Sequence, residues 1–387
     1  MTLRVLAASG DSAGHLGHAD VLLRALARDR GAAGTVALPR DSAFRDLAER
    51  RGWPVVEVGT TLGIRRELSA GVVARRLGPL VWTTLAALAD ARRALDALRP
   101  HLVIGTGGRA SFPTVLAAAQ RGIPTLTVPH FDPRRTNRML AWVADRTCVV
   151  READRARFPR PLWRRLAVTG TPLRPEAFAR PAPAEARARL GLDPRRATVG
   201  IVGYSRGSPA FSALAGEAAR ALASLRPRLQ VVVQHGVHPL RGTDGIGGIH
   251  ARPFFDDLPA VFAACDVVAS AGGETTLLEL CAAGVPSIAV ALDDTPIGPH
   301  IRVLAGGLER AGATECLRPA ETTGAGLAAR MAALLDDGPR RARMAAAGCA
   351  AVAPDAVARI VAVADELLHG RRGRGSRRPF ALRGLEG

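Results

Sequence analysis

The sequence contains no lysine, a single tyrosine and few aromatic residues of any kind. Apart from histidine, its basic side chains are therefore all arginines, and the formal net charge at pH 7 is +18. Aromatic residues make up only 4% of the chain, so a surface that stacks bases is not expected and nucleic acid is not a predicted partner. Arginine also suits phosphates and anionic membrane surfaces, and charge alone does not choose between them.

Long apolar runs and paired cysteines are also missing. There is no run of about 18 uninterrupted apolar residues, so no membrane-spanning helix is expected. The opening residues, MTLRVLAASGD, lack the pattern of a secretory signal and are typical of a buried strand. We therefore expect a reduced, cytoplasmic protein without a metal site, because no zinc or disulfide spacing links the cysteines. These five residues are Cys148, Cys265, Cys281, Cys316 and Cys349.

The chain is long enough for two domains, with 387 residues of which 48% are hydrophobic. Short β-rich runs alternate with helical stretches rich in Ala, Leu and Arg, which is typical of parallel sheets covered on both faces. Strands are predicted in the first half at 4–9, 35–39, 54–59, 101–107, 124–129 and 146–150. A second series is predicted at 197–205, 229–236, 248–254, 267–272 and 287–292.

A segment rich in proline, alanine and arginine separates the two series of strands. We place a linker at 172–196, between doubly wound α/β domains at 1–171 and 197–367. The Gly/Arg-rich end of the chain, 368–387, is expected to be disordered. Such folds bind ligands at the carboxyl ends of the strands, where the glycines of this sequence cluster.

Two glycine-containing loops follow strands of the first domain. In the first loop, Gly10 and Gly14 allow backbone to approach a ligand closely, and His15 is a candidate general base. In the second loop, Gly107 and Gly108 precede another helix. Each loop alone could equally be a plain strand-to-helix turn that serves packing.

A third loop, GYSRG at 203–207, opens the second domain. Ser205 in this loop could hold a phosphate at the start of the following helix. The same five residues fit GxSxG, the nucleophile elbow of serine hydrolases, with Asp293 or Asp294 and then His300 further along the chain. A hydrolase of that kind has one sheet instead of two balanced halves, so we consider it the weaker interpretation.

The fourth loop leads into an apolar helix that contains a single buried-looking acid. Gly272 and Gly273 end a strand, and a helix is predicted from about Glu274 to Cys281. Glu279 lies about one and a half turns into that helix, too far for a capping role. A carboxylate at this depth can accept two hydroxyl groups at once, such as those of a ribose. The alternative is a glutamate that is solvated or paired with an arginine.

Seven motifs, taken in order, resemble those of the GT-B glycosyltransferases, most closely family 28, the MurG-like peptidoglycan N-acetylglucosaminyltransferases. The resemblance covers about residues 4 to 350 with similar spacing. It implies a GT-B fold, with two Rossmann-like doubly wound domains and an interdomain cleft, the first domain binding the acceptor and the second the nucleotide sugar. The motifs are GDSAGH, IGTGGRASFP, RRTNRMLAWVADR, GTPLRPE, GYSRGS, FFDDLPAVFAACDVV and LLELCAAGVP.

The resemblance implies a UDP-sugar site in the second domain. It assigns Glu279 to the ribose hydroxyls, and Ser205 and Arg174 to the diphosphate. Phe254 would cover the uracil, and the backbone of Phe255 would contact its edge. The UDP-sugar is a substrate, and neither a cofactor nor a metal is implied. Further donor-side residues are Gly272, Gly273, Thr276 and His300.

The same resemblance places the acceptor and the catalytic base in the first domain. His15 is the first candidate for the general base, with Asp132 and His130 as alternatives. We expect an inverting, metal-independent glycosyltransferase that moves a sugar, expected to be an N-acetylhexosamine, from UDP to a hydroxyl group. The acceptor is either lipid-linked or a secondary-metabolite scaffold. Its predicted contacts are Gly14, Gly107, Gly108 and Asn137.

Several positions depart from the family pattern. His300 and Arg302 stand where the family has the Gln and Asn that contact the donor sugar. Tyr204 replaces a glycine of the phosphate loop, and His130 and Asp132 stand in a segment where the family carries a Glu. These differences favour a divergent paralogue, in cell-wall or antibiotic biosynthesis, over the core cell-wall enzyme.

Other functions stay open at this point: a nucleotide-sugar hydrolase or 2-epimerase of the same fold, the serine hydrolase, and a basic anion- or lipid-binding protein without catalysis. Membrane contact is open as well. The helix predicted around 74–95 places Trp82 beside Arg75 and Arg76, which would suit a peripheral position at the inner face of an anionic membrane. An ordinary core-facing helix is an equal alternative.

Overall fold

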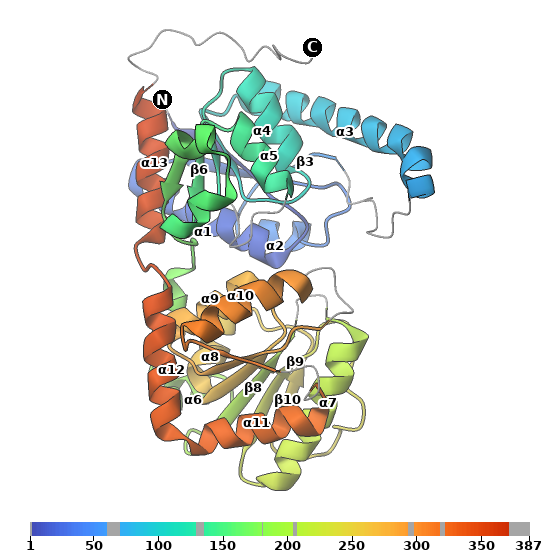
Figure 1. The fold of residues 1–387 in the computed structure, drawn as a ribbon, viewed down its shortest axis with the longest axis vertical. Coiled ribbons are helices and arrows are strands. Elements are labelled where there is room, and N and C mark those ends of the chain that lie inside the picture. The colour runs from blue at the N-terminus through green and yellow to red at the C-terminus, as the bar shows by residue number, and fades with distance from the viewer. Residues whose placement is uncertain are drawn as a thin grey trace. The chain divides into compact units, whose positions relative to one another are not determined.

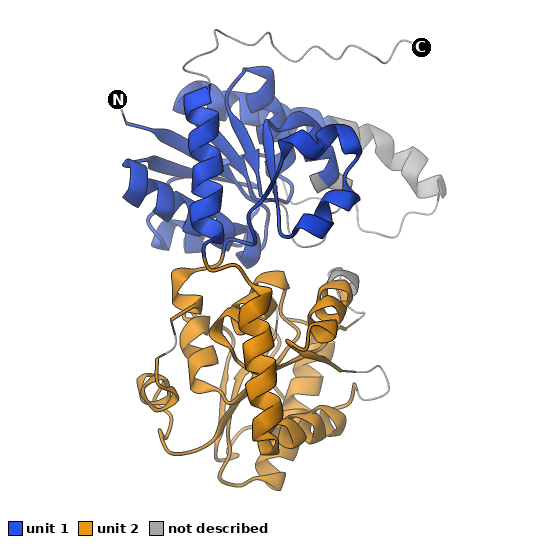
Figure 2. Cartoon of the chain, turned by 60° about the vertical axis from the view of Figure 1, so that its left-hand side comes forward, with its two compact units in different colours: residues 1–172, 355–387 blue, residues 173–354 orange. Residues whose placement is uncertain are grey.

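The computed structural model describes residues 2–59, 70–128, 135–179, 181–203, 207–292, 298–317 and 322–370, without the side chains of 70–81, 135–137 and 299–300. It divides the chain into two compact units (Figure 2). The first consists of Met1–Pro172 together with Asp355–Gly387, and the second of Leu173–Pro354.

The first unit is built on a parallel sheet with the order β3-β2-β1-β4-β5-β6-β7. Alternate residues of β1 belong to different apolar clusters on the two faces of this sheet, Val5 and Ala7 to one and Leu6 and Ala8 to the other. Burial on both faces explains why its strands read as continuous apolar runs. The strands are β1 (Arg4–Ala8), β2 (Ala33–Leu38), β3 (Val55–Glu57), β4 (Leu102–Gly105), β5 (Thr125–Thr127), β6 (Arg146–Val149) and β7 (Leu166–Val168).

Helices cover both faces of the first sheet (Figure 1). Helix α1 packs against α13 on one face, and α4 packs against both α3 and α5 on the other. The helices are α1 (Ala13–Arg30), α2 (Arg45–Arg50), α3 (Ala70–Leu98), α4 (Ser111–Gln120), α5 (Arg135–Val143) and α13 (Ala356–Gly370). Two 3-10 helices, η1 (Glu152–Arg157) and η2 (Arg160–Arg165), join β6 to β7.

The second unit repeats this plan with a parallel sheet in the order β10-β9-β8-β11-β12-β13. Its strands are β8 (Thr198–Val202), β9 (Gln230–Gln234), β10 (Ile249–Arg252), β11 (Val267–Ser270), β12 (Ser287–Ala289) and β13 (Glu315–Cys316). Its helices are η3 (Pro175–Ala177), α6 (Pro183–Arg189), α7 (Pro209–Leu225), α8 (Leu258–Ala264), α9 (Glu274–Ala283), α10 (Gly298–Arg310), α11 (Gly324–Asp336) and α12 (Gly338–Ala351).

When the strands are numbered within their own unit, both sheets have the strand order 3-2-1-4-5-6, and the first sheet adds a seventh strand after the sixth. In both sheets the order reverses direction between the first and fourth strands. The reversal lies between β1 and β4 in the first unit and between β8 and β11 in the second. Ligands of doubly wound folds bind beyond the carboxyl ends of the strands at this reversal. The four glycine-containing loops predicted from the sequence follow these four strands.

The boundaries of the two units differ from the sequence expectation at both ends of the second one. Residues from Leu173 onward, expected to be a linker, belong to the second unit, and α6 packs against α8. Helix α13, expected to end the second domain, belongs to the first unit. There Ile360 and Val361 join the core beside α1, so the apolar face of α13 is buried against the first sheet.

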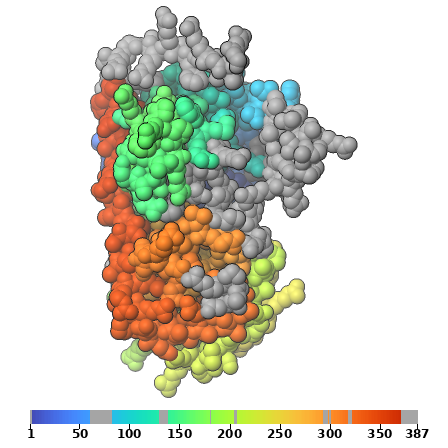
Figure 3. Space-filling view, in the orientation of Figure 1, coloured from blue at the N-terminus to red at the C-terminus, as the bar shows by residue number. Residues whose placement is uncertain are grey.

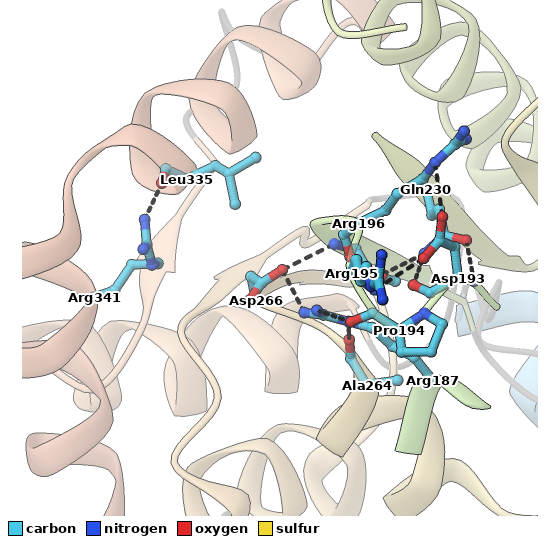
Figure 4. Close-up of polar contacts among 11 residues, drawn as sticks. Arg187, Asp193, Pro194, Arg195, Arg196, Gln230, Ala264, Asp266, Leu335 and Arg341 are labelled. Carbon is cyan, nitrogen blue, oxygen red and sulfur yellow. Dashed lines mark hydrogen bonds and ion pairs between the residues drawn. The ribbon is translucent and has the colours of Figure 1, made fainter. Parts of the chain in front are cut away.

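A network of polar contacts attaches α6 to the second sheet (Figure 4). The guanidinium of Arg187 donates from Nε to the carbonyl of Ala264 at 2.9 Å and from Nη2 to Asp266 Oδ2 at 2.8 Å. The same Asp266 oxygen accepts from the backbone N–H of Thr198, at the start of β8, at 2.8 Å. The segment before β8 is therefore fixed to the amino-terminal edge of the sheet, away from the loops that follow the strands.

One stretch, Gly338–Gly370, is long and apolar enough to cross a membrane by length and composition alone, contrary to the expectation from the sequence. The structure divides it into α12 and α13. Helix α12 packs against α9 and α11 of the second unit, whereas α13 packs against α1 and β6 of the first. Its two halves thus contribute to different cores of the fold.

Candidate active site

The two loops at the reversal of the first sheet touch each other through glycines. A Cβ atom added to Gly108 would lie 2.2 Å from the Cα of Gly10, and one added to Gly10 would lie 2.6 Å from the Cα of Gly108. Gly107 and Gly108 also have φ angles of +99° and +81°, which L side chains rarely adopt. Both loops therefore need glycine here, for close approach and for backbone conformation.

His15, in the first turn of α1, lies against this glycine contact. A Cβ added to Gly10 would stand 2.6 Å from His15 Nδ1, so the imidazole packs directly on the glycine backbone. Ser12 caps α1 by accepting from the His15 N–H at 3.2 Å, and the Thr106 hydroxyl donates to the His15 carbonyl at 3.0 Å. The half-buried ring is thus held at the carboxyl ends of β1 and β4. Gly14 lies in the first turn of the same helix.

Asp11, in the same loop, makes a contact that sequence reasoning did not predict. Its Oδ1 accepts from the hydroxyl of Ser42 at 2.8 Å and from the N–H of Ala43 at 3.1 Å. These contacts attach the loop after β1 to the segment that follows β2.

The reversal of the second sheet contains a buried ion pair. Glu279 on α9 is 2% exposed, and the Arg174 guanidinium binds both of its oxygens, Nε to Oε1 at 2.9 Å and Nη2 to Oε2 at 3.1 Å. The sequence favoured a Glu279 that faces a ribose, with an arginine partner as the alternative. The structure shows the arginine partner, from the segment that precedes η3.

The bidentate geometry fixes the plane of the carboxylate and compensates its burial, because a buried charge without a partner is costly. Burial by itself would lower the pKa of Arg174, but attraction to Glu279 and the hydrogen bonds with it raise that pKa above its usual value. A carboxylate offers about four acceptor positions, of which this fork uses two.

Gly272 and Gly273, which precede α9, have different structural roles. A Cβ on Gly272 would lie 2.7 Å from the Cβ of Thr276, so the turn has no room for a side chain there. Gly273 is the N-cap of α9, and a Cβ added to it would meet no atom within 4 Å. The open space at Gly273 lies at the start of α9, where unpaired backbone N–H groups favour an anion.

Gln234, a buried residue that sequence reasoning missed, joins the loops after β8, β9 and β10. Its Oε1 accepts from the N–H of Phe255 at 3.0 Å, and its Nε2 donates to the carbonyl of Gly203 at 3.3 Å. The Phe255 N–H is thus already used, which leaves the carbonyl as the part of its backbone able to contact a base edge. Phe254 is 38% exposed, as a side chain that covers a ligand would need to be.

Several predicted site residues lie outside the described part of the structure. His130 and Asp132, the alternative bases, are among them, and so is Ser205 of the third loop. Asn137 and His300 have described backbones, in α5 and α10, but their side chains are not described. In the described ranges no cluster of three or more His, Cys, Asp or Glu side chains is arranged to hold a metal ion.

Comparison with known proteins identifies the family. Residues 198–360 match the glycosyltransferase family 28 C-terminal domain. A relative from Desulforudis audaxviator is 30% identical over 385 residues, covering 94% of this chain and 98% of its own length. The chain belongs to glycosyltransferase family 28. That relative is named UDP-N-acetylglucosamine--N-acetylmuramyl-(pentapeptide) pyrophosphoryl-undecaprenol N-acetylglucosamine transferase.

Two further relatives agree with this assignment. A transferase of the same name from Rhodospirillum centenum is 35% identical to this family-28 chain over 383 residues, covering 92% of each. The crystal structure of MurG from Acinetobacter baumannii superposes with a TM-score of 0.66 at 21% identity, covering 95% of this chain and 100% of that one. The protein is thus a MurG-like glycosyltransferase with a GT-B fold, and the serine-hydrolase interpretation of GYSRG is set aside.

Proposed function

We propose that this family-28 enzyme transfers an N-acetylhexosamine from a UDP-linked donor to a hydroxyl group of a lipid-linked acceptor, with inversion at the anomeric carbon. The observation that carries the proposal is the buried Arg174–Glu279 pair at the reversal of the second sheet, of which Glu279 lies inside the region that matches the family-28 domain. The printed names of the relatives, which specify UDP-N-acetylglucosamine and an undecaprenol-linked acceptor, support the choice of substrates.

The donor is assigned to the second unit. Glu279, oriented by Arg174, is assigned to the ribose hydroxyls of the donor. The starts of α7 and α9 supply N–H groups for the diphosphate, with Ser205 and Arg174 assigned to the same group. Phe254 covers the uracil, and the Phe255 carbonyl accepts from its edge. Thr276 and His300 are assigned to the same donor.

The acceptor is assigned to the first unit, where Gly14, Gly107, Gly108 and Asn137 are its proposed contacts. In the reaction the acceptor oxygen forms a bond to the anomeric carbon while the bond from that carbon to the β-phosphate oxygen breaks. The bonding electrons leave with UDP, and the hydroxyl proton passes to a base, for which His15 is the first candidate. The diphosphate charge is stabilised by helix N-termini and arginine, so the proposal needs no metal.

A lipid-linked acceptor agrees with the exposed apolar side chains of α3. Trp82 is 73% exposed and Leu85 is 53% exposed, whereas the neighbouring residues 70–81 have no described side chains. Large apolar groups on a helix surface suit contact with a membrane that carries the substrate. We therefore place the enzyme at the cytoplasmic face of the cell membrane, as a peripheral protein.

The proposal is tested by calorimetric titration of UDP, TDP, GDP and their N-acetylhexosamine derivatives into wild type, Glu279→Gln and a control. The control, Glu185→Gln, removes a carboxylate on the surface of α6 that is 54% exposed. We expect UDP species to bind best, and Glu279→Gln to lose about 1–3 kcal/mol, the value of hydrogen bonds to a charged group. Equal binding of all nucleotides, or no loss in Glu279→Gln, would rule out this donor site.

A further inference from the structure

A cavity of about 240 Å³ lies in the second unit, where the end of α6 meets β10, the edge strand of the second sheet. Leu190, the C-cap of α6, and Leu192 line it from one element, and residues 249–252 of β10 line it from the other. We call it the α6–β10 cavity. In Figure 3 much of the near surface of the second unit is orange to red, the colours of α10 to α12, whereas the cavity is formed by segments that precede these helices.

Much of the lining of the α6–β10 cavity is apolar and buried. Leu192, Val232 and Phe255 contribute to it, and these residues are 5%, 2% and 8% exposed. A dry apolar cavity of about 150 Å³ is large enough to bind benzene, so this one has room for an aromatic ring with a substituent. Pockets for drug-sized ligands begin at about 300 Å³, which limits the ligand here to a smaller molecule.

The charge at the cavity comes from Arg252 on β10. Its guanidinium stacks on the Phe255 ring, with 5.4 Å between Cζ and the ring centroid. Stacking uses the face of the guanidinium and leaves its N–H groups, which lie in the plane, for an acceptor. Among the residues that the structure describes, no carboxylate forms an ion pair with Arg252. Its positive charge is therefore available to a bound anion.

The free edge of β10 adds a backbone donor beside this arginine. The Arg252 carbonyl accepts from the N–H of His235, which follows β9, at 3.2 Å. Successive residues of a strand direct their backbone groups to opposite sides, so the N–H of Ala251 points away from β9. Ala251 lines the cavity, as does His250. Burial and the charge of Arg252 lower the pKa of His250, so its ring is neutral at pH 7.

We propose that the α6–β10 cavity binds a small aromatic carboxylate, as a ligand distinct from the sugar donor and the acceptor. The ring would pack against Leu192 and Phe255, and the carboxylate would accept from the guanidinium of Arg252 and the N–H of Ala251. One arginine matches the single charge of a carboxylate. A phosphate group carries more charge and more acceptor atoms than this lining satisfies, and a neutral ring would leave the arginine without an anion.

A ligand in this cavity would also act on the donor site. The Phe255 side chain lines the cavity, and in the proposed function the carbonyl of the same residue contacts the uracil. Packing against the Phe255 ring restricts the loop after β10 before UDP arrives, so less ordering remains for UDP binding to complete. We expect the carboxylate to tighten UDP binding, and UDP to tighten carboxylate binding by the same factor. This coupling rests on the proposed function, whereas carboxylate binding by itself does not.

Titration with para-fluorobenzoate, followed by fluorine NMR in the absence of nucleotide, tests the site itself. We expect wild type to bind this ligand with a dissociation constant in the millimolar range, because it offers one ring and one ion pair. Arg252→Gln should weaken binding about tenfold, since the carboxylate loses its charged partner. The control Arg228→Gln removes an exposed arginine outside the cavity lining and should bind as wild type does.

Two further ligands and a second variant separate the parts of the site. Para-fluorobenzyl alcohol has the ring without the charge, and inorganic phosphate has charge without the ring, so each should bind about tenfold more weakly or worse. Leu190→Trp enlarges a half-buried side chain of the lining and should abolish fluorobenzoate binding. If fluorobenzoate does not bind wild type, or binds wild type and Arg252→Gln equally well, the proposal is overturned.

Calorimetric titration of UDP, with and without saturating fluorobenzoate, tests the coupling. We expect UDP to bind wild type about fivefold more tightly when fluorobenzoate is present, and Leu190→Trp to show no such change. An unchanged UDP affinity in wild type would overturn the coupling and leave the carboxylate site standing. Failure of UDP to bind at all would overturn the proposed function, which the fluorine NMR experiment does not use.

Discussion

The reversal points of the two sheets have the same topology and very different chemistry. Between β1 and β4, neutral backbone dominates: Gly10 and Gly108 touch, and the His15 ring packs on them. Between β8 and β11, a charged pair dominates: Glu279 is buried in a fork with Arg174. The strand order determines where a ligand can bind, and the loop residues determine which ligand it is.

This difference matches the division of labour that we propose. A backbone-lined loop with an imidazole can approach an acceptor closely and take its proton. A rigid, ionised carboxylate selects a group with two hydroxyls, because each hydroxyl gains a charged acceptor. Changes in the first unit should therefore affect turnover, and changes in the second should affect nucleotide affinity.

The largest expected effect concerns His15. We expect His15→Gln to lower kcat by about 10²–10⁴, the usual contribution of a general base, while the calorimetric affinity for UDP stays at the wild-type value. His369→Gln, on the exposed end of α13, is the control and should be fully active. If His15→Gln kept the wild-type kcat, His15 would not be the base, and the role would be assigned to Asp132 or His130 instead.

The buried pair of the second unit should show the next largest effect, on stability. Glu279→Leu alone leaves the Arg174 guanidinium without its partner and should lower the free energy of unfolding by about 3 kcal/mol. Glu279→Leu combined with Arg174→Met should recover much of this loss, because no uncompensated charge remains. Denaturant unfolding measures both values. If the double variant were as unstable as the single one, the pair would not be electrostatically coupled.

The glycine contact of the first unit can be broken at Gly108. Gly108→Ala places a methyl group against Gly10 at a φ angle of +81°, and we expect a loss of about 2 kcal/mol of stability together with reduced turnover. Gly17→Ala, on α1 with open space around it, should instead gain about 0.5–1 kcal/mol. Similar thermal stabilities for the two variants would show that the contact is not tight in solution.

The smallest effect is expected at Gln234. Gln234→Leu leaves the Phe255 N–H and the Gly203 carbonyl without their partner, which should cost about 1 kcal/mol or slightly more. UDP affinity should fall with it, because the loop after β10 loses its anchor, while kcat at saturating donor stays nearly unchanged. Titration and steady-state kinetics separate the two. A fall in kcat alone would place Gln234 outside the donor site.

Local sequence patterns predict much of the fold, and the differences between the predicted and the observed elements have physical causes. The predicted strands correspond to β1–β6 and β8–β12, and most of them are buried parallel strands, which are rich in apolar residues. The short strands β7 and β13, of three and two residues, were missed. The return of α13 to the first unit was missed too, because its apolar stripe would fit either sheet.

The candidate site was predictable as a set of positions, but not as a set of contacts. Glycines after strands marked the four loops, and one acid in an apolar helix marked Glu279. Its partner Arg174 lies 105 residues earlier in the chain, so no local pattern could pair them. Gln234 is the last residue of the apolar strand β9. A polar residue at that position normally marks the end of the buried part of a strand, so the sequence did not indicate its contacts.

The central claim is that Glu279 contacts the ribose of the donor, and a ligand that lacks one hydroxyl tests it most directly. Calorimetry would compare UDP with 2′-deoxy-UDP on wild type and on Glu279→Gln. Wild type should prefer UDP by about 1.5–3 kcal/mol, the range for a hydrogen bond to a charged group, and Glu279→Gln should lose most of that preference. An equal preference in both proteins would contradict the assignment, because another residue would then be reading the ribose.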